Sequence, residues 1–106
     1  MIAQPVSDPL MESSRTVAMQ VSLKATLACA AAFAHTDFRP ALPHFKVPTL
    51  FIHGTDDKTV PIDAAGRAAA LANLGSTLIE YDGAPHGLFA THKDMLTRDL
   101  LSFIRG

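Results

Sequence analysis

Two acidic residues and a histidine stand where a catalytic pair could form. Asp56 and Asp57 follow the apolar run that ends with FIHG at residues 51–54, and His86 follows a second run that ends at Tyr81. A carboxylate bonded to Nδ1 of an imidazole fixes the ring's tautomer and leaves Nε2 to accept a proton. The pattern therefore predicts an acid–base pair of Asp57 and His86. The competing interpretation is that Asp57 bonds only the backbone of its own turn and that His86 is an ordinary loop histidine.

Other polar side chains in the sequence have simpler explanations. Asp56 is interpreted as a solvated turn residue, and His53 as a packed histidine or one that supports the site from behind. A metal site would have to combine His53, Asp57 and His86, which lack a compact ligand spacing, so no metal site is predicted. Cys29 lies in an alanine-rich stretch and is predicted to be a small buried residue rather than a nucleophile.

The segments around the pair predict an α/β fold. The apolar run 47–52 has no polar alternation, which is typical of a parallel strand buried on both faces. Residues 62–73 predict a helix with Asp63 as its cap, and residues 77–81 predict a second strand. A strand–helix–strand unit crosses over right-handedly, so the two strands are parallel. Both following loops then lie at one edge of the sheet, where open α/β sheets place their sites.

The rest of the chain is predicted to be helical. Helices are expected at 9–20, capped by Ser7 or Asp8, at 23–34, capped by Ser22, and at 88–104. The first two are expected to form an N-terminal helical hairpin. The chain thus divides into cap-like helices at 1–36, a linker at 37–46, and two strands with their helices at 47–106.

Two parallel strands do not form a sheet that can stand alone. We therefore expect the C-terminal portion of a larger α/β domain, with no strand in this chain beside the outer edge of the first strand.

The loops that carry the pair resemble a known superfamily. HGTDDKTVP, followed by YDGAPHG, is similar to the loops of α/β-hydrolases that supply the triad acid and base. MQVSLKATLACAAAFAHTDFRP and APHGLFATHKDMLTRDLLSFI resemble the C-terminal part of the non-haem chloroperoxidase-like esterases, or perhydrolases. The resemblance runs from about Pro5 to Ile104. It implies that Asp57, and not Asp56, is the triad acid and that His86 is the base.

The same resemblance exposes a missing part. Family members carry their nucleophile in a G-x-S-x-G elbow upstream of these loops, and no G-x-S-x-G occurs in this sequence. The resemblance implies a small acyl or ester substrate, with peracid formation that uses neither metal nor haem, so no cofactor is expected. Such activity requires completion by an upstream segment, so this chain alone is expected to be inactive. The alternative is a non-catalytic remnant, or a module that binds a partner.

Composition narrows the remaining functional classes. The 106 residues fit one small domain, and the net charge of −1, without a basic stripe, argues against nucleic-acid binding. The apolar stretch 17–34 is interrupted by Lys24, so no membrane span or signal peptide is predicted. A single cysteine favours the reducing cytoplasm. An exposed strand edge would favour self-association.

Overall fold

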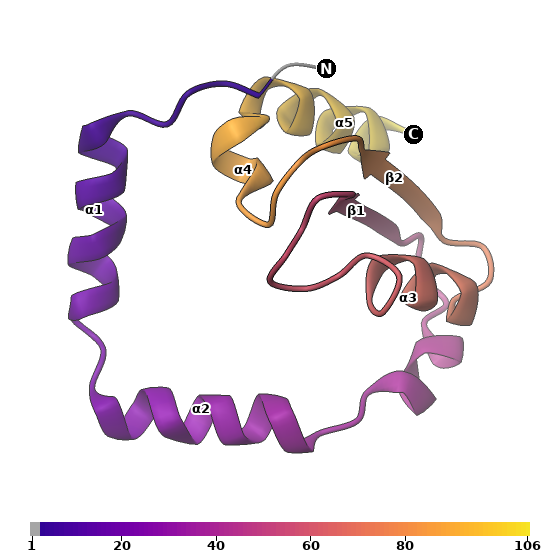
Figure 1. Ribbon diagram of the computed structural model, residues 1–106. Helices are drawn as coiled ribbons and strands as arrows, with labels where there is room; N and C mark the ends of the chain where they lie inside the picture. Colours follow the sequence, from indigo (N-terminus) through magenta and orange to yellow (C-terminus); the bar gives the residue numbers. More distant parts are fainter. Residues whose placement is uncertain (1–2) are drawn as a thin grey trace. The chain divides into compact units, whose positions relative to one another are not determined.

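The chain forms two compact units. A computed structural model describes residues 3–106. One unit is Val6–Phe38, and the other combines residues 3–5 with Arg39–Gly106. The ribbon in Figure 1 labels the elements of both units. The second unit contains both strands and both predicted site residues, so it positions the site.

The Val6–Phe38 unit consists of two capped helices. These are α1 (Asp8–Met19) and α2 (Leu23–His35). The hydroxyl oxygen of Ser7 accepts from the Leu10 amide at 3.2 Å, and that of Ser22 accepts from the Ala25 amide at 3.1 Å. Each serine thereby satisfies one of the unpaired amides of a helix start, and both caps agree with the prediction.

Neither of these helices contains a buried residue. Cys29 is therefore exposed, and its prediction as a buried residue was wrong. The alanine-rich pattern indicated a packed helix, but all described residues of α2 are exposed or only partly covered. The axes of α1 and α2 are bent by 93°, so the two helices do not form the predicted hairpin. Among the helices of residues 3–106, none by itself has the length and apolar character of a membrane span, and α1 and α2 reach them only as a bent pair.

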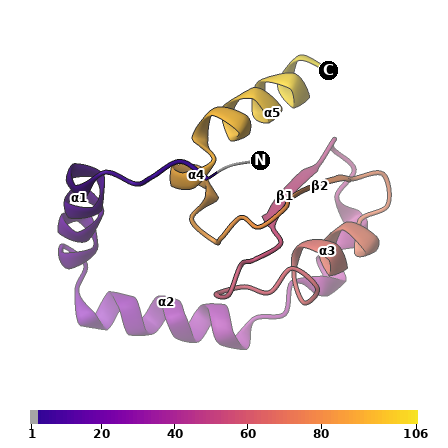
Figure 2. The ribbon, with the colours of Figure 1, turned by 45° about the horizontal axis from the view of Figure 1, so that its top comes forward.

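The second unit follows the predicted strand–helix–strand order. It contains η1 (Arg39–His44), β1 (Leu50–Gly54), α3 (Gly66–Ala72), β2 (Thr77–Tyr81), α4 (Leu88–Thr91) and α5 (Lys93–Arg105). The two strands pair in parallel, from Leu50 opposite Thr77 to Gly54 opposite Tyr81. The parallel pairing predicted from the crossover unit is therefore confirmed, as is the partial α/β fold. Helices α3 and α5 lie on opposite faces of the sheet (Figures 1 and 2).

Three predicted elements differ most from the observed ones. Strand β1 starts at Leu50 rather than Val47, because Pro48 cannot donate to the ladder and the Thr49 hydroxyl bonds the Val47 carbonyl instead. Helix α3 starts at Gly66, and Asp63 bonds Arg67 rather than capping it. The predicted helix 88–104 is broken at His92, whose φ of −128° ends α4 before α5 begins.

Strand β1 is only half-buried along most of its length. Leu50 to His53 are of intermediate exposure, and only Gly54 is buried. Burial on both faces was expected, but within residues 3–106 only β2 pairs with β1. The outer edge of β1 thus has no strand beside it in the described chain, as the two-strand pattern predicted. The core is correspondingly small, with Ile62, Tyr81 and Ala84 as its buried apolar residues.

Polar contacts fasten the helices to β2. The fully buried Tyr81 donates its hydroxyl proton to Asp99 of α5 at 2.5 Å. Burial, together with this bond to a carboxylate, raises the pKa of Tyr81 well above its usual range. On the other face, the guanidinium of Arg67 bonds both carboxylate oxygens of Glu80 and lowers the pKa of Glu80. These contacts hold β2, and the loop that follows it, in a defined place.

Candidate active site

The turn after β1 holds the Asp57 carboxylate in one orientation. Its Oδ1 accepts from the backbone amides of Thr59 at 3.0 Å and Val60 at 2.8 Å. The side chain is only 4% exposed. A short carboxylate that bonds amides two and three residues ahead forms a tight local turn. Oδ1 thus accepts two hydrogen bonds from its own turn, and Oδ2 remains available to a donor from another segment.

The loop after β2 is joined to the loop after β1. The amide of Thr55 donates to the Tyr81 carbonyl and that of Asp56 to the Ala84 carbonyl, each at 3.0 Å. The Thr55 hydroxyl oxygen accepts from the Gly83 amide at 2.7 Å. These bonds continue the pairing of the strands beyond their ends. As a result, His86, which follows Pro85, lies close to Asp57.

The two predicted residues meet at the shared edge of the sheet. His86 Nδ1 lies 2.7 Å from Asp57 Oδ2, inside the 2.6–3.2 Å expected of such a pair. Because an ionised carboxylate can only accept, Nδ1 donates this hydrogen bond, and in the neutral ring Nε2 then holds a free lone pair. The His86 side chain is 56% exposed, so this nitrogen is within reach of a second reactant. Asp56 is exposed and lies in the turn, as predicted.

The environment keeps Asp57 ionised. Burial alone raises the pKa of its carboxyl, but the bonds from the Val60 amide, the His86 ring and the Thr59 amide, with the charge of His86, outweigh burial. The pKa of Asp57 is therefore below its usual value. Because the folded state binds this proton more weakly, the group stabilises the fold at pH values above the ordinary pKa that it has in the unfolded chain. That contribution is lost as the pH falls through the lowered folded value.

His53 also contacts Asp57 but is not placed as a metal ligand. Its Nε2 lies 2.8 Å from the Val60 carbonyl oxygen and 3.3 Å from Asp57 Oδ2. A carbonyl only accepts, so this nitrogen carries a proton and has no lone pair for a metal ion. In residues 3–106, no group of three His, Cys, Asp or Glu side chains could hold a metal ion. The interpretation of His53 as a supporting residue agrees with this geometry.

Gly54 permits the two loops to approach each other. A Cβ atom at this position would lie 2.1 Å from the Ala84 carbonyl oxygen. A glycine at a strand end indicates a turn, and here it also makes room for the backbone of the histidine loop. Thr55 was missed, although a hydroxyl at a strand end that faces a second turn is a usable signal.

Gly54→Ala is expected to destabilise the fold because the added methyl group clashes with rigid backbone. Overpacking of this kind costs about 1–3 kcal/mol or more, measured as the change in unfolding free energy in urea. Gly87→Ala is the matched control, since its Cβ would meet no atom within 4 Å and should cost at most about 0.5 kcal/mol. Equal stability of the two variants would contradict the close approach at Gly54.

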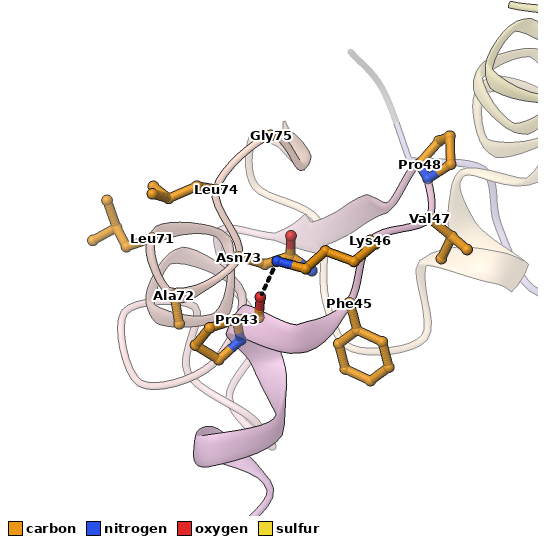
Figure 3. A pocket seen from close by; sticks show the side chains of 10 residues that line it. All are labelled: Pro43, Phe45, Lys46, Val47, Pro48, Leu71, Ala72, Asn73, Leu74 and Gly75. Carbon is orange, nitrogen blue, oxygen red and sulfur yellow. Dashed lines mark hydrogen bonds between the residues drawn. The ribbon is translucent and has the colours of Figure 1, made fainter.

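A groove of about 640 Å³ lies at the other end of the sheet. It is lined by residues 43 and 45–48, before β1, and residues 71–75, before β2. Figure 3 shows Lys46 along this groove, with its ammonium group bonded to the Pro43 carbonyl. Because the strands are parallel, their starts lie at the edge opposite the Asp57–His86 contact. The groove is therefore separate from the candidate site.

Comparison with solved structures identifies the class of the fold. The chain superimposes on a bromoperoxidase from Bacillus anthracis with a TM-score of 0.89 and 40% identity, covering 95% of this chain and 37% of that one. It superimposes on an esterase from Exiguobacterium antarcticum with a TM-score of 0.90 and 25% identity, covering 97% and 38%. The chain therefore carries part of an α/β-hydrolase fold.

Sequence comparison defines the relationship further. A non-heme chloroperoxidase of Streptomyces lividans is 42% identical over 101 residues, and a bifunctional esterase/perhydrolase of Acinetobacter calcoaceticus is 38% identical over 100 residues. Each alignment covers 94% of this chain but 36% of the relative. No protein-family model matches the chain. Within the α/β-hydrolase superfamily, the chain thus resembles the non-haem chloroperoxidase-like esterases and spans little more than a third of their length.

Proposed function

We propose that this chain supplies the acid and the base of a serine α/β-hydrolase that acts on small esters. Asp57 is the acid that orients the imidazole, and His86 is the base. The observation that carries this proposal is the 2.7 Å contact between His86 Nδ1 and Asp57 Oδ2, which leaves Nε2 as the ring nitrogen that can exchange a proton with a substrate or nucleophile. The esterase and perhydrolase named among the relatives supports the same class of substrate.

The proposed reaction needs a nucleophile from a segment outside this chain. His86 Nε2 would take the proton of a serine hydroxyl while that oxygen attacks the ester carbonyl, and would then return the proton to the departing alkoxide. The Asp57 carboxylate would stabilise the imidazolium formed in between. None of the six serines lies in a G-x-S-x-G elbow, and the hydroxyls of Ser7, Ser22 and Ser76 contact only their local backbone.

A second candidate function is association with another copy of the chain. The half-buried β1 has an edge without a strand in the described chain, and large apolar side chains of the strand-bearing unit, such as Leu71, Leu74 and Phe89, are exposed. An unpaired edge of this kind can pair with the same edge of a second copy. Analytical ultracentrifugation should show a dimer of the wild-type chain. The substitution Phe51→Lys, in β1, should shift the chain to a monomer, and a wild-type chain that sediments as a monomer would contradict this candidate function.

The proposed function is tested with a chimaera. This chain replaces the 100 aligned residues of the Acinetobacter calcoaceticus esterase/perhydrolase. We expect the chimaera to hydrolyse an activated ester and to lose that activity when His86 is replaced by Ala. His92→Ala, which removes a histidine bonded to Thr91 and not to Asp57, is the control. A folded chimaera whose activity survives without His86 would contradict the proposal.

A further inference from the structure

We propose that His53 is a positioning residue that aims the Asp57 carboxylate at His86. The role follows from three contacts of one ring, which is 13% exposed. Its Nε2 reaches the Val60 carbonyl and the Asp57 carboxylate, and its other edge lies against Gly66 of α3. The predicted effect of His53 on catalysis rests on the proposed function. The predicted effect of His53 on the Asp57 carboxylate does not, because it is measured by NMR without any assay of activity.

The first contact determines where the proton of His53 resides. The Val60 carbonyl oxygen, 2.8 Å from Nε2, cannot donate, so the ring must be protonated on Nε2. The same N–H group is 3.3 Å from Asp57 Oδ2. This oxygen therefore has two imidazole nitrogens near it, His86 Nδ1 in a 2.7 Å hydrogen bond and His53 Nε2 at the longer distance of 3.3 Å.

The second contact acts through the backbone. Val60 donates its amide proton to Asp57 Oδ1 at 2.8 Å and accepts from His53 through its carbonyl. His53 thus acts on Oδ1 through Val60, while its N–H group also lies 3.3 Å from Oδ2. Both oxygens therefore have a neighbour that favours the orientation in which Oδ2 faces the His86 ring.

The third contact holds the ring itself in place. A Cβ atom at Gly66 would lie 2.6 Å from His53 Nδ1 and 3.0 Å from its Cβ and Cγ atoms. Helix α3 therefore begins with the one residue that leaves room for the imidazole. A methyl group there would displace the ring without changing its chemistry, so Gly66→Ala should weaken the positioning of Asp57 in the same way as loss of His53.

The wild-type chain provides the first test. Nitrogen-15 NMR of the histidine rings in the full 106-residue chain should show His53 protonated on Nε2. A His53 ring protonated on Nδ1 and not on Nε2 would overturn the proposal. This measurement needs no variant, so it holds even if a substitution prevents folding.

Variants provide the second test. The titration of the Asp57 carboxyl, followed by carbon-13 NMR, should move to higher pH in His53→Leu and in Gly66→Ala. His53→Gln should restore it, since its amide can place N–H groups near both Val60 and Asp57. His92→Gln changes a buried histidine whose ring bonds Thr91, and it should leave the titration unchanged. A carboxyl titration identical in wild type and His53→Leu would refute the role.

Kinetics in the chimaera separate this inference from the proposed function. His53→Leu should lower kcat about 10–100-fold with little change in KM, because misplacement of the acid affects the reaction rather than ester binding. His53→Gln should recover most of the rate. An inactive chimaera with the expected NMR results would refute the proposed function alone, whereas an active chimaera insensitive to His53→Leu would refute the positioning role.

Discussion

Replacing Asp57 with Asn in the chimaera is expected to lower kcat about 10⁴-fold. An asparagine can present its amide to His86 Nδ1 and stabilise the tautomer protonated on Nε2, which cannot accept a proton from serine. It also removes the negative charge that stabilises the imidazolium. The fold should tolerate the change, because the Asn side-chain oxygen can still accept from the Val60 amide, which bonds Asp57 at 2.8 Å.

The neighbouring carboxylate supplies the control for this prediction. Asp56→Asn makes the same chemical change one residue earlier, at an exposed side chain. Its kcat should stay within about twofold of the parent chimaera, since surface changes away from special features are nearly neutral. Equal losses from both substitutions would mean that net charge in this loop matters, rather than a specific bond to His86.

The isolated chain is expected to give no burst of product with an activated ester and no labelling by a serine-directed phosphonate. Acylation needs a nucleophile and an oxyanion hole in addition to the acid–base pair. General-base catalysis by His86 on water provides only about 10²–10⁴-fold. Without an oxyanion hole, a further factor of about 10²–10³ is lost. Any residual hydrolysis should fall in His86→Ala.

Mass spectrometry of the phosphonate-treated chain checks this result, with the labelled chimaera as the positive control. Ser76 in particular is expected to stay unlabelled. Its hydroxyl bonds the Ala70 carbonyl, and it precedes β2, at the end of the strands opposite His86. Stoichiometric labelling of Ser76 or of any other serine in the chain would contradict the prediction and would require a different nucleophile.

Much of the candidate site could be predicted because it depends on chain order. Once 47–52 and 77–81 are assigned as strands of one crossover, parallel pairing places both following loops at one edge of the sheet. The Asp57–His86 contact then needs only the side-chain types. The choice of Asp57 over Asp56 came from the family resemblance, and the structure explains it through the turn, which buries Asp57 and exposes Asp56.

Other features depend on contacts that leave no periodic pattern. Gly54 and Gly66 look like ordinary turn and helix-start glycines, yet each makes room for a particular neighbour. The buried state expected for Cys29 failed because residue composition reports what a helix prefers, and not whether another element covers it. Similarly, β1 is less buried than its apolar run indicates, since burial depends on neighbours on both edges.

The bonded loops at the end of the sheet also bear on the entropy cost of assembling such a site. Asp57 and His86 are separated by 29 residues, and the bonds of Thr55 and Asp56 that join their loops span similarly short stretches. Closing a loop of this length costs little more than closing a shorter one, because the entropy grows only logarithmically. Pairing of the two loops therefore adds little to the chain-entropy cost of forming the strand–helix–strand unit itself.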